Sequence, residues 1–171
     1  MRLNNRRNNR IEFYKILVVR FGYIYNESMY KCSYFGIKEL VSPTVYNKWG
    51  ERAWMFFDED ILKELDFIRE TYKSPIIINS WKNNLKQCGL RSNLDEITKE
   101  KTKNNVLYLS AHTMGKAFDL HCHYGHNEKL WQHLYDLIRL RRLKKFKRLE
   151  NKTQTPTWVH TDTFQSDGIV F

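Results

Sequence analysis

Hydrophobic side chains recur at helical spacing in two segments of the chain. Residues 58–72, DEDILKELDFIRETY, and residues 127–140, NEKLWQHLYDLIRL, each place apolar residues three or four positions apart, which predicts amphipathic helices. Asp58 precedes the first of these stripes as a typical N-cap residue. The apolar positions are Ile61, Leu65, Ile68 and Tyr72 in the first segment and Leu130, Leu134, Leu137 and Ile138 in the second.

Three other segments have the pattern of β-strands. Residues 74–80, SPIIINS, are a β-branched run behind a Ser-Pro break, and residues 115–123, GKAFDLHCH, alternate apolar with polar side chains. Residues 144–164 predict two strands around a polar turn. The sequence therefore predicts an α+β fold, with a small antiparallel sheet, helices packed on one side of it, and a site in a groove at the edge of the sheet.

The remaining segments indicate how the chain is organised. Residues 1–10 are Arg and Asn with almost no apolar content, which predicts a basic flexible arm. Residues 11–171 are expected to form a single domain, since the chain has 171 residues and is 42% hydrophobic. Residues 11–49 indicate strand, loop and a short helix, and the polar residues 81–106 predict a long, mostly irregular loop.

The net charge indicates which kinds of molecule the protein could bind, and the cysteine content indicates whether disulfides are expected. The net charge of +10 indicates attraction to a polyanion, and residues 139–148, RLRRLKKFKR, concentrate it. No helix-turn-helix, zinc finger or base-stacking motif accompanies them, so nucleic acid is not the favoured partner. The three cysteines, Cys32, Cys88 and Cys122, predict no disulfide framework, and no segment has the pattern of a signal peptide or a membrane span.

Alternation along two strands places chemically active side chains together. Asp119 lies on the polar side of its strand, and His160 and Asp162 share one side of theirs. If these strands are neighbours, His160 can meet Asp119, and His112 can fold back to the same point because Gly115 permits unusual backbone geometry. Two imidazoles and a carboxylate can hold Zn²⁺ and leave the fourth tetrahedral position open.

Residues 110–120, SAHTMGKAFDL, resemble the S-x-H-x-x-G-x-A-x-D signature of the zinc D-Ala-D-Ala carboxypeptidase family. That family also includes peptidoglycan endopeptidases of phages and is related to vancomycin-resistance dipeptidases and the hedgehog signalling domain. TWVHTD, residues 157–162, resembles the family's closing W-x-H segment, and GIKELVSPTVYNKWG, IIINSWKN and CGLRSN are similar to the entry region of phage-type members. The resemblance covers roughly residues 36–164.

The resemblance implies a role for several residues. It makes His112, Asp119 and His160 the zinc ligands, with Ser110 and Gly115 shaping the segment between them. It implies that Arg91, or failing that Lys82, holds a substrate carboxylate or polarises the scissile carbonyl.

One position departs from the family pattern. Related enzymes usually carry a Glu, Asp or His three residues before the last ligand as general base, whereas this chain has Thr157. Asp162 is the favoured replacement, because it follows His160 by two residues on the same strand face and can reach either the metal water or a ligand histidine. Glu150, on the preceding strand, is the second candidate.

The function implied is that of a zinc peptidase acting on peptidoglycan, either a D,D-carboxypeptidase or an endolysin-type endopeptidase, encoded by a phage. Its partners would be peptidoglycan stem peptides. It would be made in the host cytoplasm without a signal peptide and act in the cell envelope or travel in the virion. The alternative is a virion structural or cargo protein that keeps the fold, contacts other virion proteins and has little or no activity.

Two other groups of residues have a possible chemistry that the sequence does not favour. His121, His123 and His126 could form another metal site, but no third well-spaced ligand accompanies the H-x-H pair, so surface or supporting roles are expected. Cys88 could be a nucleophile, but the sequence pairs no histidine with it.

Overall fold

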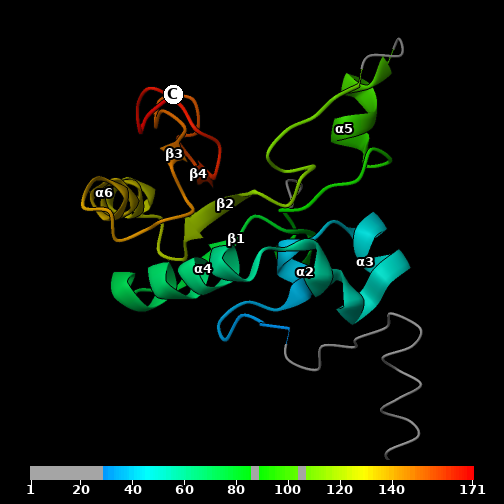
Figure 1. Ribbon diagram of the computed structural model, residues 1–171, viewed down its shortest axis with the longest axis horizontal. Coiled ribbons are helices and arrows are strands. Elements are labelled where there is room, and N and C mark those ends of the chain that lie inside the picture. Colours follow the sequence, from blue (N-terminus) through cyan, green and yellow to red (C-terminus); the bar gives the residue numbers. More distant parts are fainter. Residues whose placement is uncertain (1–28, 86–88, 104–106) are drawn as a thin grey trace, which may run out of the picture.

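The computed structural model describes residues 29–85, 89–103 and 107–171 (Figure 1). The elements are α2 (Ile37–Leu40), α3 (Pro43–Trp49), the 3₁₀ helix η1 (Gly50–Phe56), α4 (Glu59–Tyr72), β1 (Ile76–Ile78), the 3₁₀ helix η2 (Trp81–Asn83), α5 (Glu96–Lys101), β2 (Ala117–Cys122), α6 (Asn127–Arg139), β3 (Arg148–Leu149) and β4 (Val159–Asp162). The basic arm expected at residues 1–10 lies outside the described residues, as does Cys88.

The four strands form one antiparallel sheet in the order β1-β2-β4-β3. β2 and β4 are the two central strands, and their register pairs Asp119 with His160. The β3–β4 register pairs Arg148 with Asp162. The sequence predicts the functional groove at the sheet's edge, but Asp119 and His160 lie on central strands, because the chain passes through α6 and β3 before β4 inserts beside β2.

One face of the sheet packs on helices α4 and α6 (Figure 1). The side chains that alternate onto this face are almost fully buried, with Phe118 and Leu120 both 0% exposed, and they join one core cluster with Leu65 and Leu134. α6 packs against β2, β3 and β4. The expected α+β fold, with a small antiparallel sheet covered by helices on one side, is confirmed.

Both long helices occur where the apolar spacing predicts them. α4 begins after Asp58, whose Oδ1 accepts a hydrogen bond from the backbone N–H of Asp60 at 2.8 Å. The segment 81–106 differs from the expected irregular loop, because it contains η2 and α5. α5 has only six residues, too few for hydrophobic periodicity to be recognised, and in Figure 1 it stands away from the sheet.

Residues 89–91 are held tightly against the junction between α2 and α3. The Leu90 N–H donates to the Leu40 carbonyl at 2.8 Å, and the Ser42 N–H donates to the Leu90 carbonyl at 2.9 Å. A Cβ atom at Gly89 would lie 2.4 Å from the Leu40 carbonyl oxygen, so only glycine fits there. This contact fixes the backbone immediately before Arg91.

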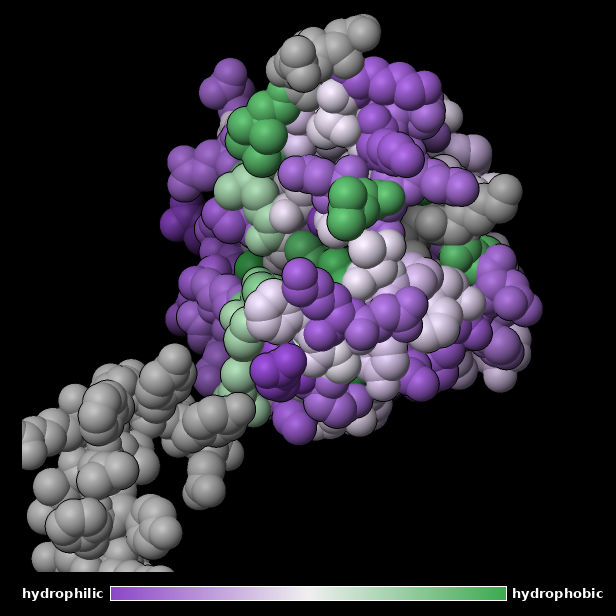
Figure 2. Space-filling view, turned by 90° about the vertical axis from the view of Figure 1, so that its right-hand side faces the viewer, coloured by the Kyte–Doolittle hydropathy of each residue, from purple (hydrophilic) through white to green (hydrophobic). Residues whose placement is uncertain are grey.

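The surface that includes α3 and α5 is mostly hydrophilic. Figure 2 shows hydrophobic side chains at separate places on this face, with hydrophilic residues between them. The most exposed apolar side chains of the described residues near α5 are Leu94, Leu107 and Leu109. No helix among the described residues is both long and apolar enough to cross a membrane.

Replacing Gly89 by Ala is expected to lower the free energy of unfolding by about 3 kcal/mol, because the new methyl group would overlap a backbone oxygen that cannot move freely. Gly125→Ala is the matched control, since its φ is +76° but no atom lies within 4 Å of the added Cβ, and it is expected to cost about 1 kcal/mol. Urea denaturation of both variants measures the difference. Equal losses would show that the close approach at Gly89 does not matter.

Candidate metal centre

His112 is placed by a turn that immediately precedes β2. The Gly115 N–H donates to the His112 carbonyl at 3.2 Å, and Gly115 has a φ of +66°, a conformation that glycine adopts without strain. Ser110 and Thr113 bond one another across the same turn. The His112 ring then packs inward, where its Nδ1–H can donate to the Gly89 carbonyl at 2.9 Å and leave Nε2 facing the sheet.

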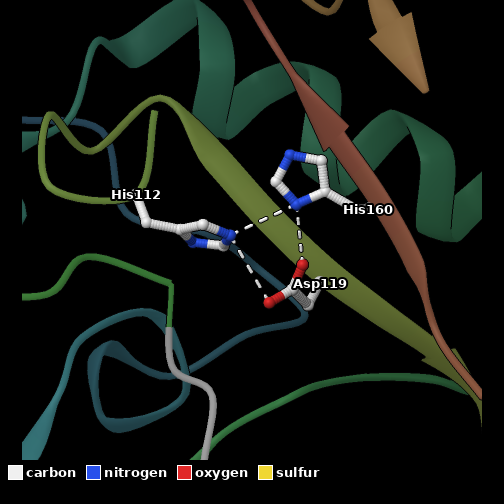
Figure 3. A group of neighbouring side chains, drawn as sticks. All are labelled: His112, Asp119 and His160. Carbon is white, nitrogen blue, oxygen red and sulfur yellow. Dashed lines mark hydrogen bonds and ion pairs between the residues drawn. The ribbon is translucent and has the colours of Figure 1, made fainter. Parts of the chain in front are cut away.

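Asp119 and His160 meet His112 over the sheet's open face (Figure 3). His160 Nδ1 lies 2.8 Å from Asp119 Oδ1, His112 Nε2 lies 3.4 Å from Asp119 Oδ2, and the two ring nitrogens are 3.2 Å apart. One ligand atom from each residue lies within 4.8 Å of the others. These residues could therefore hold a metal ion, as the sequence predicts.

The Asp119 carboxylate is 2% exposed and lies among two histidine rings and a guanidinium group. Besides the two histidines, the Arg91 guanidinium lies 3.2 Å from Asp119 Oδ2. Lys82, the alternative to Arg91, instead pairs with Glu39 at 2.9 Å. Of the two candidates, Arg91 is therefore the one at the candidate metal centre, where it pairs directly with Asp119.

The protonation states follow from this burial and pairing. Burial by itself would raise the pKa of Asp119, but His112 and His160 hold that pKa well below its usual range. Burial lowers the pKa of His112, so this ring stays neutral. Burial also opposes a charge on His160, but its hydrogen bonds to Asp119 and Asp162 raise its pKa to about 9. In the metal-free protein at neutral pH, His160 is therefore an imidazolium ion between two carboxylates.

Asp162 contacts the outer side of the His160 ring. Its Oδ2 lies 3.3 Å from His160 Nε2, on the opposite side of the ring from Asp119. Arg148 binds Asp162 through two hydrogen bonds, from Nε to Oδ1 at 3.0 Å and from Nη2 to Oδ2 at 2.8 Å. The sequence predicts that Asp162 either reaches the metal-bound water or orients a ligand histidine. This geometry fits the second role, because Asp162 holds the His160 ring in place.

Glu150 lies opposite His160 across the β3–β4 pair. Its backbone N–H donates to the His160 carbonyl at 3.2 Å, one position beyond the Leu149–Thr161 pair. Directly paired residues share one face of a sheet, so Glu150, His160 and Asp119 form a row across three strands. Glu150 also lines the cavity at the metal centre.

A cavity of about 400 Å³ opens onto the three candidate ligands. It is lined mainly by cationic, aromatic and hydroxyl side chains: Arg91, Lys101 and Arg148, then Tyr108, Trp158, Phe164 and Phe171, then Ser110 and Thr155. Thr155 is 4% exposed, and its Oγ1 has no hydrogen-bond partner among the described residues. This buried hydroxyl can therefore bond a ligand in the cavity.

Sequence reasoning missed Arg148 and Phe171 as parts of this site. Arg148 is the last residue of the basic run 139–148, whose other lysines and arginines are expected to be solvated. Strand alternation could have distinguished Arg148 from them, because it is two positions from Glu150 and therefore shares a strand face with this candidate. Phe171 carries no recognisable signal, since it reaches the cavity through a backbone pairing outside the four strands.

The other candidates of the sequence lie away from the three ligands. Thr157 is exposed, and its carbonyl accepts a hydrogen bond from Asn127 Nδ2 at 2.7 Å. Among the described residues, the His112, Asp119 and His160 group is the one with metal-ligand geometry, so His121, His123 and His126 form no second site there.

Comparison with known proteins gives no family assignment. A scan against protein-family models, a search of curated proteins and a search of solved structures each found no match to this chain. The function of this chain is therefore inferred from the residues of the site.

The raised pKa of His160 predicts how pH affects the metal-free protein. A histidine whose pKa rises from 6.5 to about 9 on folding stabilises the folded state fully below pH 6.5, and this contribution is lost as pH rises through 9. The free energy of unfolding is thus expected to fall by up to about 3 kcal/mol over that interval. Urea denaturation at several pH values measures this fall, and the His160→Gln variant should lack it. The same fall in both proteins would contradict the assignment.

Proposed function

We propose that this protein is a zinc-dependent peptidase that acts on the stem or cross-link peptides of peptidoglycan and is encoded by a phage. The observation that carries the proposal is the convergence of His112 Nε2, an Asp119 oxygen and His160 Nδ1 at the floor of a cavity. Two imidazoles and one carboxylate with an open fourth position are a typical ligand set of catalytic zinc.

The spacing of these atoms supports zinc as the metal. Ligands about 2.0–2.2 Å from a tetrahedral ion lie about 3.3–3.6 Å from one another. The separations of His112 Nε2 from Asp119 Oδ2, 3.4 Å, and from His160 Nδ1, 3.2 Å, are close to this range. The shorter separation of 2.8 Å between His160 and Asp119 is a hydrogen bond, whose proton a metal ion would replace.

The second partner of each histidine also suits a metal ligand. His112 Nδ1 faces the Gly89 carbonyl and His160 Nε2 faces Asp162, so each ring is held in place while its other nitrogen points to the centre. Such supporting bonds fix the tautomer and orientation of ligand histidines. The resemblance of residues 110–120 and 157–162 to the D-Ala-D-Ala carboxypeptidase family supports the substrate class.

We assign the proton-transfer step to Glu150 rather than to Asp162. Asp162 is 1% exposed, and Arg148 bonds to both of its oxygens. Its carboxylate is therefore held in place and is poorly placed to exchange a proton with a water in the cavity. Glu150 lines the cavity beside His160, and its carboxylate has no hydrogen bond or ion pair among the described residues. Directly after β3, and in line with His160 and Asp119, it would take the role for which this chain has Thr157 in place of an acid.

The mechanism then follows from the residues around the cavity. Zinc, when bound, polarises the scissile carbonyl and makes the attacking water more acidic. Glu150 accepts a proton from this water and later donates it to the nitrogen of the leaving amine. Arg91 lines the cavity beside Asp119, where its charge would stabilise the negative oxygen that develops on the substrate.

Zinc content and loss of turbidity of isolated cell walls test the function together. The parent is expected to bind one zinc ion per chain and to clear the walls, whereas His160→Ala should lose both properties because it removes a ligand. Thr157→Ala is the control and should retain both, since Thr157 is exposed and outside the cavity. Stoichiometric zinc without any wall cleavage would instead favour the virion structural or cargo role.

The two carboxylates are expected to give different defects. Glu150→Gln should lower kcat about 100-fold or more while zinc affinity stays near that of the parent, because it removes a proton acceptor and no ligand. Asp162→Asn should lower zinc affinity about 10-fold to 100-fold, because it weakens the support of His160. Zinc titration and steady-state kinetics separate these effects, and the reverse pattern would return the proton-transfer role to Asp162.

A further inference from the structure

Residues 169–171 run beside β3 and bring an aromatic ring to the metal centre. Val170 forms a parallel bridge with Leu149, and the Phe171 N–H donates to the Leu149 carbonyl at 3.1 Å. The Asn151 N–H in turn donates to the Phe171 carbonyl at 3.0 Å. Both the N–H and the carbonyl of Phe171 are thus bonded to residues 149–151, and its side chain lines the cavity.

The ring of Phe171 covers the guanidinium group of Arg148. The Arg148 Cζ lies 4.0 Å from the centre of the Phe171 ring and 5.6 Å from that of Phe164. A cation this close to an aromatic face is attracted to it, and the attraction is stronger when the cation is partly desolvated. The Arg148 side chain is only 18% exposed, so Phe171 restricts both its position and its contact with water.

Arg148 in turn restricts Asp162, which contacts the candidate metal ligand His160. Its two hydrogen bonds hold the plane of the Asp162 carboxylate, and Asp162 Oδ2 faces His160 Nε2 at 3.3 Å. The Phe171 ring also makes a T-shaped contact with the His160 ring, with centres 6.0 Å apart and planes at 77°. Phe171 therefore touches both the first and the last member of the series Arg148, Asp162 and His160.

We propose that Phe171 is a positioning residue of the metal centre, which acts through Arg148 and Asp162 to hold the His160 ring with Nδ1 directed at the ion. This inference rests on the proposed function. Leucine at position 171 would keep an apolar side chain but lose the aromatic face over Arg148. The Arg148 guanidinium could then move away from Asp162, and the Asp162 carboxylate would hold the His160 ring less firmly.

Zinc affinity of the purified full chain, measured by calorimetric titration after zinc removal with a chelator, tests the proposal. Phe171→Leu is expected to lower the affinity about fivefold. Val170→Ala is the matched control, because Val170 is on the same segment and similarly exposed but is not among the residues lining the cavity. It should change the affinity less than twofold.

A double-mutant cycle shows whether the effect passes through Asp162. In the Asp162→Asn background, Phe171→Leu should lower zinc affinity less than twofold further, because the carboxylate that it acts through is gone. An unchanged affinity in Phe171→Leu would overturn the proposal. So would an equal loss in Val170→Ala, or the same fivefold loss in the Asp162→Asn background.

Unfolding of the metal-free chain separates this inference from the proposed function. Phe171→Leu is expected to raise the unfolding equilibrium constant about fivefold in the parent, but less than twofold in Asp162→Asn. If the parent binds no zinc, the proposed function is wrong, and this cycle still tests the coupling. Equal effects in the two backgrounds would show that Phe171 does not act on the Asp162 and His160 pair.

Discussion

The antiparallel pairing of β2 with β4 is the constraint on which the site depends. Its register places Asp119 directly opposite His160, while Phe118 and Leu120 point into the core on the other face. Because side chains alternate along a strand, a slip of one residue would move Asp119 into the apolar core. The burial of the core thus enforces the meeting of the two candidate ligands, and Glu150, directly after β3, lies on the same face.

A carboxylate as buried as Asp119 is costly unless its charge is balanced. Arg91 and protonated His160 supply that balance in the metal-free protein, in which His112 is neutral. Buried ionic groups of this kind are often no more stabilising than apolar side chains of similar volume. The group is therefore poorly explained by stability alone, and a divalent ion bound there would take over the charge of the His160 proton.

The sequence predicts the position of those helices and strands whose apolar side chains recur with a regular spacing. The periodicity of 58–72 and 127–140 locates α4 and α6, and alternation in 115–123 and 157–162 places Asp119 and His160 on matching faces. α5 was missed because six residues do not establish a period. Strand alternation could have placed Arg148 on the face of Glu150, but the surrounding basic run obscured it. The Phe171 ring could not be located, because its place depends on which segments are neighbours, and that order is a property of the whole chain.

The proposed metal centre requires that three side chains, from a turn and two central strands, hold one ion between them. A crystal structure of the zinc-loaded protein, with anomalous diffraction measured at the zinc absorption edge, tests it most directly. We expect a single strong peak bonded to His112 Nε2, an Asp119 oxygen and His160 Nδ1. A peak at other residues, or none at stoichiometric zinc, would contradict it.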